Sequence, residues 1–310
     1  MGTVELGVGI AQTDLAAGIV DVARVVEQAG LESLFVVEHT HVPASRRDVL
    51  EDELHWRSAR VLDPFTVLGA AAAVTSGLKL GTAICVVPQH DPIILAKQVA
   101  TIDHLSGGRF LFGAGAGWLV EEMRNHGVQP HLRWDLMREQ LSAMKTIWAN
   151  DEAEFHGEFV DFDPICLWPK PVQAPHPPLL IGGTGPRSLR IAAEHGDGWM
   201  PIVDDATELE TQLTQLQHFC RLIGRENLEV TAVIWESEAN EQLLARCAEL
   251  GVSRFVMVAL MEDLSTVQAC LERYLQVAER AGLRLHSLAK APTFQNAEKL
   301  RPGASPHPPA

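Results

Sequence analysis

Residues 79–114 read KLGTAICVVPQHDPIILAKQVATIDHLSGGRFLFGA. The first segment, Lys79–Val87, is mostly apolar and does not alternate with polar residues, which predicts a strand buried on both faces. An Asp-Pro pair then begins a helix, Asp91–Leu105, because Asp caps a helix N-terminus and Pro suits its first position. A Ser-Gly-Gly triplet ends this helix, and Arg109–Ala114 predicts a second strand. This order of elements is a βαβ unit, the building block of a parallel sheet.

The same unit recurs along the chain. Strands are predicted at Val4–Ile10, Leu34–Glu38, Lys79–Val87, Arg109–Ala114, Leu179–Gly183, Asp197–Ile202, Leu228–Trp235 and Arg254–Leu260. Helices are predicted at Ala16–Ala29, Asp63–Thr75, Asp91–Leu105, Arg133–Asn150, Pro186–His195, Ala206–Leu222, Asn240–Leu250 and Leu264–Ala281. Eight strand–helix units predict an α/β fold of the (β/α)8 TIM-barrel type. The turn after the first strand lacks G-x-G-x-x-G, which argues against an open dinucleotide-binding sheet.

A single barrel domain is expected over residues 1–289. Two segments exceed a minimal barrel, an insertion at about 39–62 and another at about 119–178, of which Asp151–Pro178 is Pro-rich and is predicted to be irregular. Both follow strand ends, so they belong to the C-terminal face of the strands, where barrels carry their active sites. The tail, residues 290–310, is rich in Pro, Ser and Ala and is predicted to be disordered.

Composition narrows the function classes. The 310 residues are 46% hydrophobic and carry a net charge of −15, which argues against nucleic-acid binding. No apolar stretch approaches the length of a membrane span, and the N-terminus does not read as a signal peptide. The five cysteines are widely spaced and form no C-x-x-C pair, which favours reduced thiols and a cytoplasmic protein.

The segment Glu38-His39-Thr40-His41 ends the second predicted strand, at the functional face of a barrel. Histidine titrates near neutral pH, so His39 is predicted to transfer protons or to bind a cofactor, with Glu38 either orienting it and fixing its tautomer or holding the strand end together. Two alternatives stay open. The cluster can simply solvate a loop, or His39 and His41 can bind a metal, as in barrel hydrolases. The fifth and sixth strands end in Gly182-Gly183-Thr184 and Pro201-Ile202, which offer no histidine, and the eighth ends near Glu262-Asp263, a partial match only.

A glycine-rich turn, Gly182-Gly183-Thr184-Gly185, precedes a predicted helix that starts at Pro186. Backbone N–H groups and the helix dipole at such a turn favour a phosphate, and Arg187 can add a charged contact. The alternative is a tight strand–helix turn that needs glycine for its geometry.

A second small-residue run, Gly113–Gly117, ends the fourth predicted strand and is followed by Trp118. Small side chains such as Gly115 leave space for a flat ring above the barrel, with Trp118 as a wall. Close packing of the strand against a helix is the alternative.

Three stretches together resemble the bacterial-luciferase-like superfamily of flavin and deazaflavin (coenzyme F420) oxidoreductases. They are FVVEHTHVP at 35–43, the segment 78–118, and FHGEFVDFDPICLWPKPVQAPHPPLLIGGTGPRSLRIAAEHGDGW at 155–199. The resemblance covers most of residues 4–260 in the expected order. It is strongest to the F420-dependent branch common in actinobacteria.

The resemblance implies a barrel with insertions, often dimeric. It implies a cofactor, coenzyme F420 or alternatively FMN, whose phosphate lies near Gly183–Gly185 and whose ring lies beside His39. It also implies a non-proline cis peptide at Ala83–Ile84 under the ring, and a substrate pocket near Trp118 and His41. In the sugar-phosphate dehydrogenase branch a Glu occupies the position of Trp118, and in luciferase a reactive Cys occupies that of Gly115, so neither of those reactions is indicated.

The expected function is hydride transfer between F420 and a small organic substrate. The first alternative is an FMN-dependent monooxygenase that uses O2 and reduced flavin, with a reductase partner supplying the reduced cofactor. A metal-dependent hydrolase built on His39 and His41 is a second alternative, and a non-catalytic flavin-binding relative is a third. A homodimer is expected from the resemblance, with no nucleic-acid or membrane partner.

Overall fold

The computed structural model describes residues 3–46, 57–226, 228–259 and 263–285. Its eight barrel positions are β1 (Thr3–Ile10), β2 (Ser33–Val36), β3 (Lys79–Thr82), β5 (Phe110–Gly115), β8 (Leu179–Gly182), β9 (Gly198–Met200), β10 (Glu229–Trp235) and β11 (Arg254–Ala259). Neighbouring strands pair in parallel, and β11 also pairs with β1, which closes the sheet into a barrel. The predicted TIM-barrel fold is therefore confirmed.

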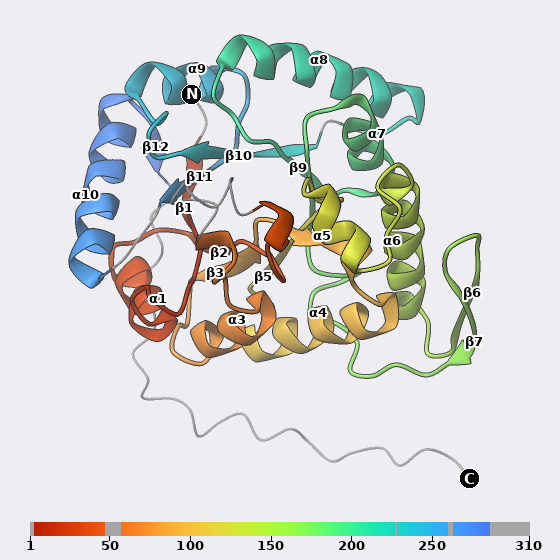
Figure 1. Cartoon of the computed structure of the whole chain (residues 1–310). Coiled ribbons are helices and arrows are strands. Elements are labelled where there is room, and N and C mark those ends of the chain that lie inside the picture. The colour runs from red at the N-terminus through yellow and green to blue at the C-terminus, as the bar shows by residue number, and fades with distance from the viewer. Residues whose placement is uncertain (1–2, 47–56, 227, 260–262, 286–310) are drawn as a thin grey trace.

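Helices surround these strands, and all but α5, which lies over the end of the barrel, form an outer ring (Figure 1). They are α1 (Ile19–Gln28), α3 (Pro64–Ala72), α4 (Pro92–Ser106), α5 (Val120–Asn125), α6 (Arg133–Ala149), α7 (Pro186–His195), α8 (Ala206–Leu222), α9 (Glu241–Glu249) and α10 (Leu264–Arg280). Short 3-10 turns lie at η1 (Ala44–Arg46) and η3 (Val87–Gln89), and a short strand, β12 (Arg284–Leu285), runs parallel to β1. Asp63 and Asp91 cap α3 and α4, as their sequence positions predict.

Two sequence predictions need correction. The strand expected at Lys79–Val87 is interrupted by a cis peptide bond, Ala83–Ile84, and resumes as β4 (Cys85–Val86), which pairs with β5. The stretch expected to be irregular contains an antiparallel hairpin, β6 (Ala153–His156) and β7 (Asp161–Ile165). Glu139 of α6 anchors this hairpin, because its carboxylate accepts the N–H groups of Phe159 and Val160 at 2.6 and 2.7 Å.

A buried ion pair ties strands together at the N-terminal face of the barrel. Glu32, next to β2, receives two hydrogen bonds from Arg254 of β11, at 2.9 and 3.0 Å, and lies 2.7 Å from Lys79 Nζ of β3. Burial raises the pKa of Glu32, but the two cations outweigh it and bring this pKa to about 2. This cluster joins residues far apart in the chain, opposite the face where function is expected.

The barrel interior is filled by a compact apolar group. Its buried members are Phe35, Leu111, Leu180, Met200, Val233, Val256 and Val258. This packing closes the barrel below its C-terminal face, so a ligand has room only above it.

Three further predictions stand as follows. Within the described residues, no helix is long and apolar enough to cross a membrane. All five cysteines are free thiols, four of them buried. The predicted tail at 290–310 lies outside the described residues, as do Leu260 and residues 47–56 of the first insertion.

Candidate active site

A cavity of about 270 Å³ opens at the C-terminal ends of the barrel strands and is called the inner cavity here. Its lining is mostly apolar and includes Ile84, Trp118 and Trp235. Glu38 and His39 from the end of β2 also line it, as does Glu122 of α5. A mostly apolar pocket with a few convergent polar groups is the usual form of a small-molecule site.

Glu122 holds His39 at the edge of the inner cavity. Its Oε2 lies 2.9 Å from His39 Nδ1, while its Oε1 accepts the backbone N–H and the hydroxyl of Thr40 at 2.8 and 3.1 Å. Burial raises the pKa of Glu122, but the hydrogen bonds from His39 and Thr40 outweigh it, so this pKa lies below its ordinary value. An ionised carboxylate accepts only, so His39 donates through Nδ1 and keeps Nε2 for a bound molecule.

Trp118 stands against this histidine. Its ring meets that of His39 edge to face, with centroids 5.8 Å apart and planes at 85°. Trp118 is 56% exposed and lines the inner cavity, in agreement with the predicted wall.

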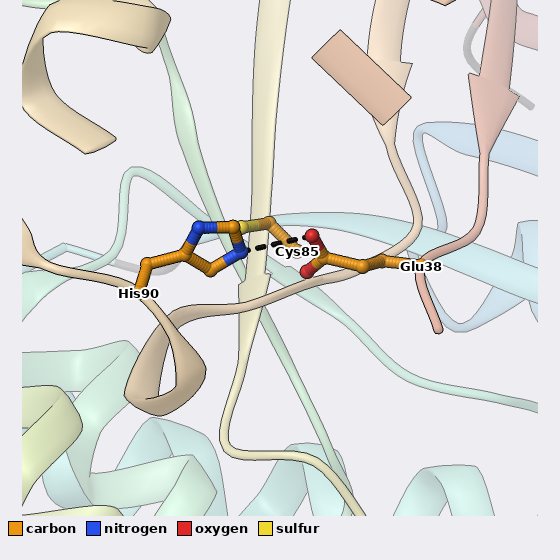
Figure 2. A group of neighbouring side chains, drawn as sticks. All are labelled: Glu38, Cys85 and His90. Carbon is orange, nitrogen blue, oxygen red and sulfur yellow. Dashed lines mark hydrogen bonds and ion pairs between the residues drawn. The ribbon is translucent and has the colours of Figure 1, made fainter. Parts of the chain in front are cut away.

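The expected partnership of Glu38 with His39 is wrong. Figure 2 shows that the Glu38 carboxylate faces His90, with Cys85 beside the pair. Glu38 Oε1 lies 2.8 Å from His90 Nε2, and its Oε2 accepts the Val86 N–H at 2.5 Å. Glu38 therefore holds the end of β2 to the segment that contains β4 and η3. Glu122, and not the adjacent Glu38, orients His39.

The potential metal ligands do not gather at His39 and His41. Among the described residues, the group of three whose ligand atoms lie within 4.8 Å of one another is Glu38, Cys85 and His90. Both oxygens of that carboxylate already accept hydrogen bonds, and burial and Glu38 hold the pKa of the Cys85 thiol well above its ordinary value. Within the described part of the chain, no third potential ligand joins His39 and His41 in such a group.

His41 is not among the residues that line the inner cavity. Its Nδ1 lies 2.8 Å from the Thr40 hydroxyl, and its Nε2 accepts a hydrogen bond from Asn125 at 2.8 Å. It therefore supports the loop rather than the expected substrate pocket.

The cis peptide implied by the resemblance is present, and it explains the glycines around it. A Cβ at Gly115 would lie 2.8 Å from Ile84 Cδ1, and one at Gly182 would lie 2.9 Å from Ile84 Cγ2. The Ile84 side chain thus fills the space that these glycines leave. The expected open platform at Gly115 is corrected to close packing, with Ala83 and Ile84 themselves lining the cavity.

The phosphate turn borders a separate cavity of about 270 Å³, called the loop cavity, which Gly183 and Thr184 line. Ile202 lines both the loop cavity and the inner cavity, so the two are adjacent. Gly183 has a φ of +105°, which a side chain rarely tolerates. Gly182 does not line the loop cavity, and Gly185 is the N-cap residue of α7.

Charges around this turn differ from the expectation. The carboxylates of Asp204, Asp205 and Glu208 share the loop cavity. Arg187 lies elsewhere, in a cavity of about 440 Å³ that it lines with Arg138 and Arg190. Its guanidinium donates to the His131 carbonyl at 3.4 Å, so the structure does not bring it to Gly183 and Thr184.

Sequence reasoning missed Glu122, Thr40 and His90. Glu122 lies in a six-residue helix without a clear apolar period, 83 positions from His39. The only signal was an acidic pair, Glu121-Glu122, shortly after a glycine run at a strand end. His90 directly precedes the Asp-Pro helix start, so it too sits at a strand's C-terminal end.

Comparison with known proteins places this chain. The pattern of the family described as "luciferase-like monooxygenase" matches residues 4–235. An uncharacterized protein of Mycobacterium tuberculosis is 41% identical over 260 residues, which cover 81% of this chain and 90% of that protein. An FMNH2-dependent dimethylsulfone monooxygenase of Pseudomonas putida is 31% identical over 190 residues, 60% of this chain and 52% of that protein.

Among solved structures, an F420-dependent secondary alcohol dehydrogenase in complex with an F420–acetone adduct superposes with a TM-score of 0.74 at 19% identity. The match covers 90% of this chain and 99% of that one, and it supports the fold alone. The family match extends over the barrel from β1 to the end of β10. The chain therefore belongs to the luciferase-like monooxygenase family, a family of oxidoreductases.

Proposed function

We propose that the protein is a coenzyme F420-dependent oxidoreductase that moves a hydride between the deazaflavin and a small organic substrate. The observation that carries the proposal is His39, held by Glu122 at 2.9 Å on the edge of an apolar cavity at the barrel mouth. The bound deazaflavin supplies the hydride chemistry, and the protein supplies position, a proton and a dry environment.

The residues at the barrel mouth suit a flat, phosphorylated cofactor. Ala83 and Ile84 line the inner cavity as an apolar surface, and the adjacent loop cavity offers the backbone of Gly183 and Thr184. Asp204, Asp205 and Glu208 share the loop cavity and would repel a phosphate bound directly at Gly183 and Thr184. The arginines of α6 and α7 lie beyond Pro186 and supply positive charge nearby.

His39 gives or takes the proton that accompanies the hydride, through its Nε2. Glu122 orients the ring, because its carboxylate accepts the Nδ1 proton of His39 at 2.9 Å and so leaves Nε2 toward the reacting atoms. Trp118, Trp235 and Ile202 exclude water from the reacting atoms.

Preference for F420 rests on the sequence resemblance. A monooxygenase that uses reduced FMN is the second candidate, favoured by the identity to the Pseudomonas putida enzyme. In that case a reductase partner would supply the flavin.

A binding titration of the purified protein with F420 and, separately, with FMN tests the proposal. Fluorescence quenching with F420 and none with FMN is the expected result. His39→Ala should keep that binding and abolish turnover. Binding of FMN alone would favour the monooxygenase, and binding of neither cofactor would overturn both readings.

A further inference from the structure

A second cavity lies behind the inner one and is called the outer cavity here. It has a volume of about 430 Å³ and lies between η3, α5, α6 and the β6–β7 hairpin. His90 and His126 both line it, whereas Glu38, His39 and Glu122 line the inner cavity. Ionisable side chains therefore form the wall between the two spaces.

Two hydrogen-bonded chains cross this wall. In the first, Glu38 Oε1 meets His90 Nε2 at 2.8 Å, a single step from one cavity to the other (Figure 2). In the second, His39 reaches Glu122, which reaches the Thr40 hydroxyl, which lies 2.7 Å from His126 Nε2.

The first chain is better suited to carry protons. Glu122 has a lowered pKa, so it resists taking a proton, and burial and His41 lower the pKa of His126. Burial lowers the pKa of His90 as well, but Glu38 outweighs it and leaves the pKa of His90 above its ordinary value. Of the two histidines on the outer cavity, His90 therefore takes up a proton more readily than His126.

The outer cavity also offers a binding site for water. Gln140 is 3% exposed and lines this cavity, and its Nε2 donates to the His90 carbonyl at 2.8 Å. Its Oε1 is buried and accepts no hydrogen bond from the described residues. A buried acceptor of this kind normally binds water, and the cavity has ample room for several molecules.

We propose that Glu38 and His90 form a proton relay that connects the reacting atoms in the inner cavity to water in the outer cavity. This inference rests on the proposed function, because a hydride transfer needs a proton that travels separately. His90 acts through Glu38 and is a positioning and relay residue, whereas Glu38 faces the bound molecules.

The relay balances without any other reagent. A water in the outer cavity gives a proton to His90 Nδ1, which points away from Glu38 in Figure 2. The Nε2 proton of the resulting imidazolium passes to Glu38, and Glu38 passes its proton to the acceptor in the inner cavity. No electrons move, one proton enters and one leaves, and the reverse order serves the opposite reaction.

Several charged groups surround His90 and set its titration. Glu38 and Asp63 favour the cation, and Cys85 adjoins Glu38 as a neutral thiol. Asp91 follows His90 in the chain and caps α4. His126, the C-cap residue of α5, lines the same cavity as His90, and a positive charge on either ring disfavours one on the other. A change at any of these groups should move the pH dependence of the relay.

The test follows oxidation of reduced F420 by the artificial acceptor dichlorophenolindophenol, because this assay needs no knowledge of the natural substrate. His90→Gln keeps an N–H donor for Glu38 but has no basic nitrogen. We expect it to bind F420 normally, to turn over about 10- to 100-fold more slowly, and to show a larger solvent deuterium effect. Gln129→Ala, an uncharged residue on the same cavity, is the matched control and should change the rate little.

His90→Ala supplies the second measurement. Truncation leaves a hole next to the outer cavity that imidazole can enter, so added imidazole should restore turnover in proportion to its concentration. A purely structural role would not be rescued in this way. If His90→Gln matches the wild type in rate and pH profile, or if imidazole fails to rescue His90→Ala, the relay is wrong and the proposed function stands. If the wild type neither binds nor oxidises F420, the proposed function itself fails, and the relay falls with it.

Discussion

At the scale of single residues, the site depends on a carboxylate that positions a histidine. Glu122 contacts both His39 and Thr40, so it fixes the ring and the loop that carries it. Its lowered pKa keeps it ionised at neutral pH, so its two oxygens accept hydrogen bonds from His39 and Thr40 there.

We predict that Glu122→Gln lowers turnover by about 10-fold or more while leaving cofactor affinity within error, because general acid–base catalysis loses its charged partner. The variant should also lose the part of the acid-side fall in rate that comes from protonation of Glu122. Steady-state rates across pH measure this, with Glu121→Gln on the same helix as the control. An unshifted profile with a normal rate would show that Glu122 is not coupled to the reaction.

Single residues also show which part of the site the sequence predicts: His39 is predicted, whereas Glu122 and His90 are not. His39 was found because a polar cluster ends a buried strand, and the end of a barrel strand has one functional face. Glu122 and His90 were missed because their partners lie 83 and 52 positions away, and no local period links them. Adjacency in sequence suggested Glu38 for His39, but successive residues at a strand end point in different directions.

At the scale of elements, capping residues and glycines marked most helix boundaries correctly. The hairpin β6–β7 escaped prediction because its strands are short, carry Pro164 and are mostly exposed. The apolar run Lys79–Val87 likewise gives no sign of the break between β3 and β4. The indirect sign of it is Gly115 of β5 and Gly182 of β8, which leave room for the Ile84 side chain.

We predict that Gly115→Ala displaces Ile84, destabilises the fold by about 1–3 kcal/mol and weakens cofactor binding, because overpacking forces backbone shifts. Adding Ile84→Ala removes the clashing atoms and should recover part of the stability. Urea unfolding and the cofactor titration measure both effects. Gly18→Ala is the control, since a Cβ there meets nothing within 4 Å. Equal losses in the single and the double variant would contradict the packing argument.

At the scale of the whole molecule, the two faces of the barrel have different roles. The C-terminal face carries the inner and loop cavities and the two histidines that pair with carboxylates, His39 and His90. The N-terminal face carries the Glu32–Arg254–Lys79 cluster. The side chains of Glu32 and Arg254 are only 5% and 7% exposed, and they join β2 to β11 across the junction that β1 closes. This cluster should therefore affect stability and leave the reaction unchanged.

We predict that Glu32→Gln lowers the free energy of unfolding by about 3–5 kcal/mol at neutral pH, because it leaves Arg254 buried without its carboxylate. Folding depresses the pKa of Glu32 from 4.5 to about 2, so its stabilisation is fully present above pH 4.5 and is lost as pH falls through about 2. The difference in free energy of unfolding between wild type and variant should therefore narrow on acidification over this window.

Urea unfolding at neutral pH and at about pH 3 measures this gap. Glu241→Gln, whose partner Arg280 is exposed, is a control that should change little. A gap that is absent at neutral pH, or that widens in acid, would mean that the barrel closes without help from this ion pair.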